Sequence, residues 1–180
     1  MSKEAFARAY HHAGAALRPR AAAAFRPPYV VLHVRQPDAN TFDFFSMLPP
    51  RFCTGSVVQA LLAAGLTLAL VSNDAPRALA ALPPSPRLRA SRGSPYDDAA
   101  LLLEAEGVVQ HSPFYSSFSS APAMARGLPL INTHDPGPDG GPHWYERRFR
   151  RHGPLPAEFH TCQEAELFVE GVLWRVRNRH

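Results

Sequence analysis

The chain has 180 residues, of which 46% are hydrophobic, 19% charged and 10% aromatic, and its net charge is +4. This length suits one domain with a core of its own, and the composition excludes collagen-like, coiled-coil and disulfide-knot proteins. Only two cysteines are present, Cys53 and Cys162, so at most one disulfide can form.

The 19 prolines predict short elements joined by stiff turns. No apolar run approaches the ~20 residues that cross a bilayer, so we expect no membrane span. The first residues carry charge early and lack the apolar segment of a secretion signal. By default we therefore expect a cytoplasmic location.

Helical and strand-like segments alternate along the chain. Residues 3–17 place apolar side chains at helical spacing, and a linker rich in Ala and Pro follows up to residue 28. Residues 29–34 form an apolar, β-branched run typical of a buried strand. Further strands are expected at 66–71, 87–90, 107–111 and 128–132. Further helices are expected at 55–65, 76–82, 97–106, 116–126, 143–151 and 162–177.

This alternation, with its short connections, predicts an α/β fold built on a mainly parallel sheet with helices on both faces. We expect residues 1–28 to form a helix and linker that pack on the domain, and residues 29–180 to form one three-layer α/β/α domain. Ligands of such sheets bind outside the carboxyl ends of the strands. The informative residues therefore follow Val34, Val71, His111 and Ile131.

Two of these strand ends carry candidate functional residues. His33 and Arg35 lie two apart at the end of the first strand, so they share a face; an ion pair with Asp38 would explain them equally well. The fourth strand leads into the segment HSPFYSSFSS, residues 111–120. Hydroxyl and backbone donors at a helix start suit a phosphate, although a single serine often only caps the helix. The chain has neither a Walker loop nor a GxGxxG segment.

Three segments of the chain resemble, in order and spacing, the nucleotide-sugar-binding half of fucosyltransferases. They are YVVLHVRQPD, LVSNDAPRALAAL and DDAALLLEAEGVVQHSPFYSSFSSAPAMARGLPLI. The resemblance covers roughly residues 1–135 and extends to the α1,6-, α1,2- and protein O-fucosyltransferases. It implies a Rossmann-like domain similar to the C-terminal domain of a GT-B glycosyltransferase. It also implies GDP-fucose as the donor, with no metal and no other cofactor.

The resemblance assigns donor-binding roles to residues that match the family pattern. Arg35 matches the arginine that holds the β-phosphate of the donor, a task suited to bidentate pairing. His33 matches the histidine beside the nucleotide, and Asp98 the aspartate that contacts guanine, although a charge at a helix start would also explain Asp98. Asp74 matches one member of an acidic pair whose other member is here Asn73.

The resemblance also places hydroxyls on the phosphate and a base near the acceptor. Ser119 and Ser120 match the helix-start hydroxyls, and Ser117 belongs to an alternative register of the same motif. Asp43 matches the base that deprotonates the acceptor hydroxyl, although it could equally be a surface aspartate in a loop. Gln36 replaces a second arginine of many α1,6-type members.

The resemblance implies transfer of the sugar, with inversion, to a hydroxyl of a glycan or protein acceptor. The family has two Rossmann-like domains, and the segments found here match only the second. A nucleotide-sugar-binding module without catalysis, or a subunit that needs a partner chain carrying the acceptor domain, therefore stays open as an alternative.

A nucleic-acid binder is a weaker alternative. Arginines concentrate at residues 147–151 and 175–179, but no aromatic ladder or zinc-finger spacing accompanies them. The histidines show no regular metal spacing, so we expect no metal site.

Overall fold

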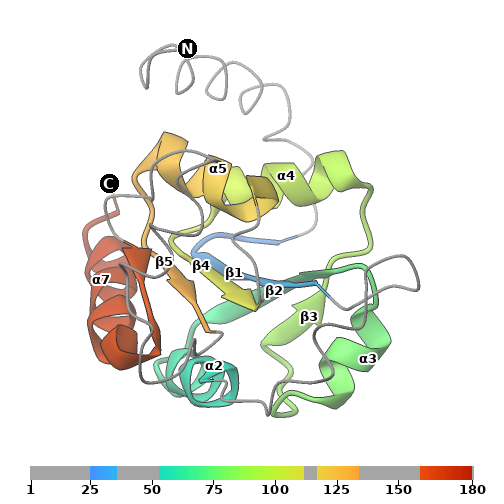
Figure 1. The fold of residues 1–180 in the computed structure, drawn as a ribbon, viewed down its shortest axis with the longest axis horizontal. Coiled ribbons are helices and arrows are strands. Elements are labelled where there is room, and N and C mark those ends of the chain that lie inside the picture. The colour runs from blue at the N-terminus through green and yellow to red at the C-terminus, as the bar shows by residue number, and fades with distance from the viewer. Residues whose placement is uncertain (1–24, 36–52, 112–116, 134–158, 180) are drawn as a thin grey trace, which may run out of the picture.

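The computed structural model describes residues 25–35, 53–111, 117–133 and 159–179 (Figure 1). Its strands are β1 (Tyr29–Val34), β2 (Thr67–Ser72), β3 (Leu88–Ala90), β4 (Val108–His111), β5 (Leu130–Asn132) and β6 (Phe159–His160). Its helices are α2 (Thr54–Ala63), α3 (Ala75–Ala80), α4 (Pro95–Glu104), α5 (Ser117–Arg126), α7 (Ala165–Arg177) and the short 3₁₀ helix η2 (Cys162–Glu164). The expected helices at 3–17 and 143–151, and so most of the expected segment 1–28, lie outside the described residues.

The six strands form one sheet in the order β3-β2-β1-β4-β5-β6, and every neighbouring pair is parallel. This is the strand order of the Rossmann fold. The prediction of a Rossmann-like α/β domain with a parallel sheet is thus confirmed. At the centre of the sheet, β1 pairs with β2 on one side and with β4 on the other, where His33 lies opposite Gln110.

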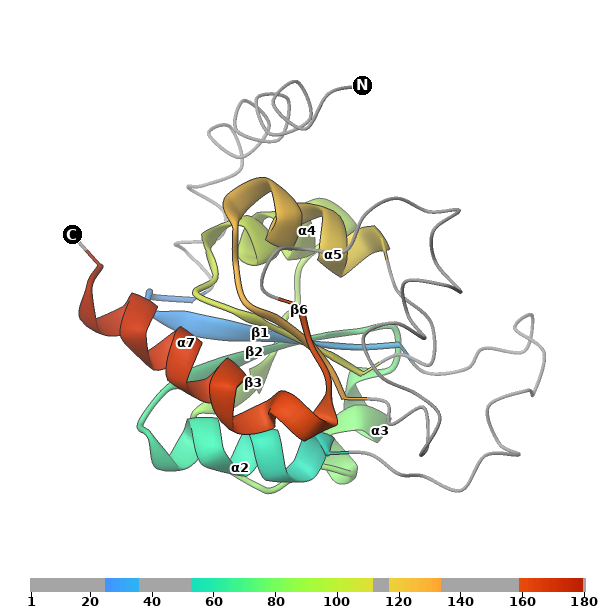
Figure 2. The same ribbon diagram turned by 60° about the vertical axis from the view of Figure 1, so that its left-hand side comes forward.

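The helices form the two outer layers of the fold. Helices α4 and α5 cover one face of the sheet, and α2, α3 and α7 cover the other (Figures 1 and 2). Along β1, successive side chains point to opposite faces. Tyr29 and Val31 accordingly join the core under α4 and α5, whereas Val30 and Leu32 join the core over α2 and α7. Both faces of β1 are therefore buried, which is why its sequence is apolar throughout.

Local signals in the sequence explain where several helices begin and end. Gly65 follows α2 and Gly127 follows α5, each at a positive φ (83° and 58°) that favours glycine. Helix α4 begins at Pro95, two residues before the expected start. The reason is a capping box in which Ser94 and Asp97 satisfy each other's backbone N–H groups.

The far edge of the sheet contains two features that the sequence did not predict. Strand β6 pairs with β5 over only two residues, with Phe159 opposite Leu130. Directly after it, Cys162 forms a disulfide with Cys53, with a Cα–Cα distance of 5.6 Å. The bridge joins residues 109 positions apart and ties the start of α2 to the start of the η2–α7 segment.

At the opposite, amino edge of the sheet, a buried carboxylate holds the end of α7. Glu106 accepts a salt bridge from Arg179 at 2.7 Å and lies 3.7 Å from the guanidinium of Arg175.

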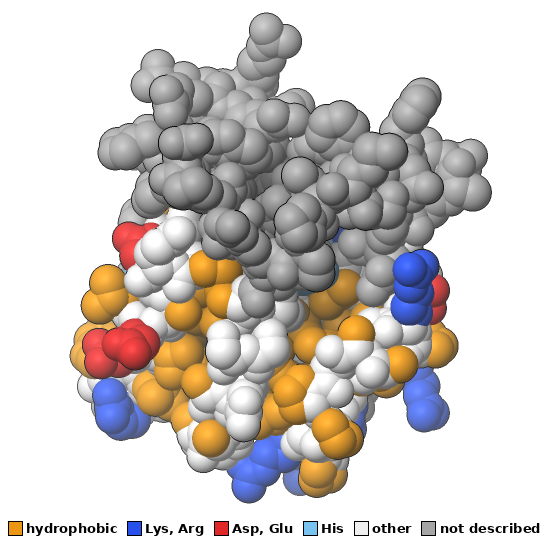
Figure 3. Space-filling view, turned by 60° about the horizontal axis from the view of Figure 1, so that its bottom comes forward, with side chains coloured by type: hydrophobic (Ala, Val, Ile, Leu, Met, Phe, Trp, Pro, Cys, Tyr) orange, Lys and Arg blue, Asp and Glu red, His pale blue; other side chains and the backbone are white. Residues whose placement is uncertain are grey.

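On the face formed by α2, α3 and α7, basic side chains stand at separate points among apolar and polar ones (Figure 3). None of the described helices is both long and apolar enough to cross a membrane.

Candidate functional site

The topology creates a switch point between β1 and β4. The chain leaves β1 toward α2 on one face of the sheet, and it leaves β4 toward α5 on the other face (Figure 2). In sheets of this order the crevice at the carboxyl ends of two such strands is the usual ligand site. The residues at this edge come from the ends of β1 and β4, the start of α5 and the end of β5.

A buried hydrogen-bonded triad connects β1, β4 and α5 at this edge. His33 Nδ1 lies 3.0 Å from Ser119 Oγ, and the Ser119 hydroxyl donates to Gln110 Oε1 at 3.1 Å. Because that hydroxyl has one proton, His33 must donate its Nδ1–H to Ser119, which leaves the imidazole lone pair on Nε2. All three side chains are buried, and they fix the first turn of α5 against the sheet.

The imidazole of His33 is neutral at physiological pH. Its pKa is lowered from 6.5 to about 4, first because burial disfavours the charged ring and second because the Arg35 guanidinium repels it. Phe118 covers the ring, with the two ring centroids 5.5 Å apart. His33 therefore acts here as a hydrogen-bonding group and not as a cation.

Arg35 lies directly beyond β1 at the switch point. Its side chain is exposed, and its backbone N–H donates to the carbonyl oxygen of His111 at 3.3 Å. This bond continues the β1–β4 ladder by one residue past the last pair, Val34 and His111. This bond thus holds the backbone of Arg35 at the end of β4, and the residue as a whole is exposed.

A second polar cluster lies on the other face of the sheet, at the start of α2. Thr54 Oγ1 is 2.7 Å from both His111 Nδ1 and Thr133 Oγ1, and the Thr133 hydroxyl donates to the Gln110 carbonyl oxygen at 3.3 Å. Side-chain alternation explains the separation, because His33 and Gln110 face α5 while His111 faces α2. The edge therefore carries one histidine cluster on each face.

The two predicted acidic residues have different surroundings. Asp74 is the N-cap of α3 and accepts from the Arg77 backbone N–H at 3.2 Å. Asp98 lies in the first turn of α4, where the neighbouring Asp97 provides the capping box. Burial raises the pKa of Asp98 above its ordinary value; a hydrogen bond from Ser91 opposes this rise and the charge of Asp97 adds to it. Among the described residues, no donor lies within hydrogen-bonding distance of the buried Oδ1 of Asp98.

The remaining predicted site residues are placed only in part. Ser120 is buried in the first turn of α5, next to Ser119. Ser117 begins that helix, and its side chain lies outside what the structure describes. Asp43 also lies outside the described residues. The structure thus brings together His33, Arg35 and Ser119, and it places Asp74 and Asp98 at the starts of α3 and α4, which cover opposite faces of the sheet.

Sequence reasoning missed Gln110, Thr54, Thr133 and the disulfide. A glutamine inside the apolar run GVVQH was the one signal for a buried polar partner in β4.

Among the described residues, no group of three or more His, Cys, Asp or Glu side chains is arranged to hold a metal ion. The chain matches no model of a known protein family and no curated protein.

Proposed function

We propose that the chain binds a nucleotide sugar, GDP-fucose, at the carboxyl edge of β1 and β4, and that it acts as a glycosyltransferase. The observation that carries the proposal is the position of Arg35. Arg35 is an exposed residue at the switch point of a Rossmann-ordered sheet, two residues beyond a histidine bonded to the first turn of α5. The comparisons with known proteins add no support, so the proposal rests on the resemblance and on this geometry.

The proposed role of Arg35 follows from its charge. A guanidinium pairs with two phosphate oxygens at once, and it would stabilise the diphosphate that leaves when the glycosidic bond breaks. The backbone N–H groups at the start of α5 would add favourable partial charge, since that helix begins at the same edge. Ser119 already bonds to His33 and Gln110, so its present geometry favours a role in orienting this turn.

The remaining parts of the proposal concern the base, the acceptor and the location. Asp98 would accept hydrogen bonds from the guanine base, and Asp43 would deprotonate the acceptor hydroxyl of a glycan or protein. A partner chain would supply the facing acceptor domain. The cytoplasmic location remains a prediction; the disulfide favours an oxidising compartment instead, because cytosolic thiols are kept reduced.

Calorimetry with GDP, UDP and ADP tests the proposal. We expect GDP to bind most tightly, and we expect Arg35→Ala to weaken GDP binding by about 1.5–3 kcal/mol, the scale of a lost charge-assisted contact. Arg177→Ala is the matched control, because it removes an exposed charge from the last turn of α7. Equal or absent responses to the three nucleotides would exclude a guanine nucleotide site. Tight GDP binding without release of GDP from GDP-fucose would favour the non-catalytic module.

A further inference from the structure

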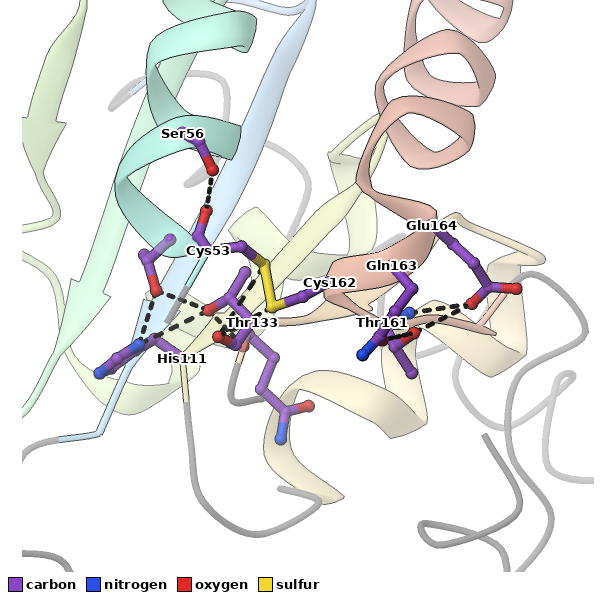
Figure 4. Close-up of a disulfide and its surroundings, with 10 residues drawn as sticks. Cys53, Ser56, His111, Thr133, Thr161, Cys162, Gln163 and Glu164 are labelled. Atoms are coloured by element: carbon purple, nitrogen blue, oxygen red, sulfur yellow. Dashed lines mark hydrogen bonds between the residues drawn. A yellow bond between two sulfur atoms is a disulfide. The ribbon is translucent and has the colours of Figure 1, made fainter. Parts of the chain in front are cut away.

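The Cys53–Cys162 disulfide lies against the end of β5, at the carboxyl edge of the sheet. The Cys53 backbone N–H donates to the Thr133 carbonyl oxygen at 3.2 Å. The same oxygen lies 3.3 Å from Cys162 Sγ and 3.9 Å from Cys53 Sγ (Figure 4). Thr133 is fully buried. The bridge therefore fixes the start of α2 relative to Thr133, the residue after β5.

Thr54, the residue after Cys53, connects the disulfide to β4 through the hydrogen bonds of its hydroxyl. Thr54 Oγ1 shares short hydrogen bonds with His111 Nδ1 and Thr133 Oγ1, and Thr133 Oγ1 lies 3.3 Å from the Gln110 carbonyl oxygen, which also accepts the Thr133 backbone N–H at 2.9 Å. These side chains form one connected set of hydrogen bonds. Its two shortest bonds, both 2.7 Å, meet at Thr54 Oγ1.

His111 then connects this set of hydrogen bonds to Arg35. Its side chain bonds to Thr54, while its backbone carbonyl accepts the Arg35 N–H at 3.3 Å. A continuous series of bonds thus joins the disulfide to the exposed arginine, through one buried hydroxyl and one strand end. Removing the Thr54 hydroxyl would take away the partner that His111 Nδ1 and the Thr133 hydroxyl share, and these two groups would keep only a longer contact with each other, at 3.5 Å, in place of their two bonds of 2.7 Å to Thr54.

We propose that Thr54, anchored by the Cys53–Cys162 disulfide, is a positioning residue that holds the end of β4 and thereby sets Arg35 for a nucleoside diphosphate. The proposal rests on the proposed function for its ligand, and on the observed bonds for its path. Thr54 itself would not contact the ligand, because its hydroxyl is buried between His111 and Thr133.

Three variants of the first turn of α2 test the proposal by calorimetry with GDP. Thr54→Val keeps the shape of the side chain and removes the hydroxyl, and we expect it to weaken GDP binding roughly three- to thirtyfold, the range of couplings between linked sites. Thr54→Ser keeps the hydroxyl and should bind within about twofold of the native chain. Ser56→Ala is the control in the same turn, because Ser56 is exposed and bonds only to the Cys53 carbonyl among the contacts drawn in Figure 4. Removing the disulfide, as Cys53→Ala with Cys162→Ala, should weaken binding in the same direction as Thr54→Val.

A double-mutant cycle separates positioning of Arg35 from a general loss of structure. In the Arg35→Ala background, Thr54→Val should cause little further loss of GDP affinity, because its effect passes through that side chain. Additive losses would overturn the proposal, as would native GDP affinity in a folded Thr54→Val variant.

Hydrogen exchange without ligand tests the same path independently of the proposed function. Thr54→Val should speed exchange of the Arg35 amide more than that of amides within β2. If the native chain fails to bind GDP, the proposed function is refuted, and this measurement still decides the coupling. Unchanged exchange at Arg35 would overturn it.

Discussion

Acidification should destabilise the protein through His33. The folded-state pKa of this side chain is about 4 and its ordinary value is 6.5, because burial and the Arg35 charge disfavour the imidazolium. Above pH 6.5 the contribution of the neutral ring to stability is fully present. As the pH falls toward 4, the unfolded chain binds a proton that the folded chain does not, so stability is lost at about 1.4 kcal/mol per pH unit. The full loss is about 3 kcal/mol, and it levels off below the folded-state pKa.

Urea unfolding at a series of pH values between about 8 and 5 measures this loss, which should reach about 2 kcal/mol over the lower part of that range. His33→Gln removes the titrating group, so the difference in slope between the two proteins isolates its contribution from the other histidines. The pH series stops near 5 because protonation of Asp98, whose pKa is raised in the folded state, has the opposite effect and favours the folded state at low pH. An equal pH dependence in the native chain and the variant would refute the view that His33 is buried and neutral.

Three further variants test the packing of the domain. Ser119→Ala should lower the free energy of unfolding by about 1–3 kcal/mol in urea titrations, because it leaves a buried imidazole and a buried amide without their shared partner. Replacing Cys53 and Cys162 by alanine should cost about 4–5 kcal/mol, the loop-closure entropy of a bridge across 109 positions, measured as the shift of the urea midpoint relative to the oxidised native chain. Gly107→Ala would place a Cβ 2.5 Å from Val172 Cγ2, and we expect a loss of about 1–3 kcal/mol by thermal unfolding; a neutral result would show that α7 shifts freely.

The fold was predictable because its strong local signals agree with its long-range packing. Strand β1 has the apolar sequence YVVLHV and is buried on both faces, so composition alone identified it. Glycines at the ends of α2 and α5 marked those boundaries correctly. Strand β6 has only two residues at the sheet edge, too few for any periodicity to show.

The candidate site was predictable only in its location. The alternation of strands and helices put His33 and Ser119 at the carboxyl edge, but their hydrogen bond joins positions 86 residues apart. That bond depends on the register that places His33 opposite Gln110, which the hydrophobic pattern does not encode. For the same reason the sequence could permit a disulfide and yet give no indication that it would lie against Thr133.

Both histidine clusters end on one residue of β4. On the α5 face, the side-chain oxygen of Gln110 accepts from Ser119, which accepts from His33. On the α2 face, the backbone carbonyl of Gln110 accepts from Thr133. A buried polar residue in a central strand is costly unless all its groups are bonded, and here those bonds fix the helix starts on both faces of the sheet. Gln110 thus couples the two halves of the carboxyl edge, so a change on the disulfide side has a direct structural route to the arginine side.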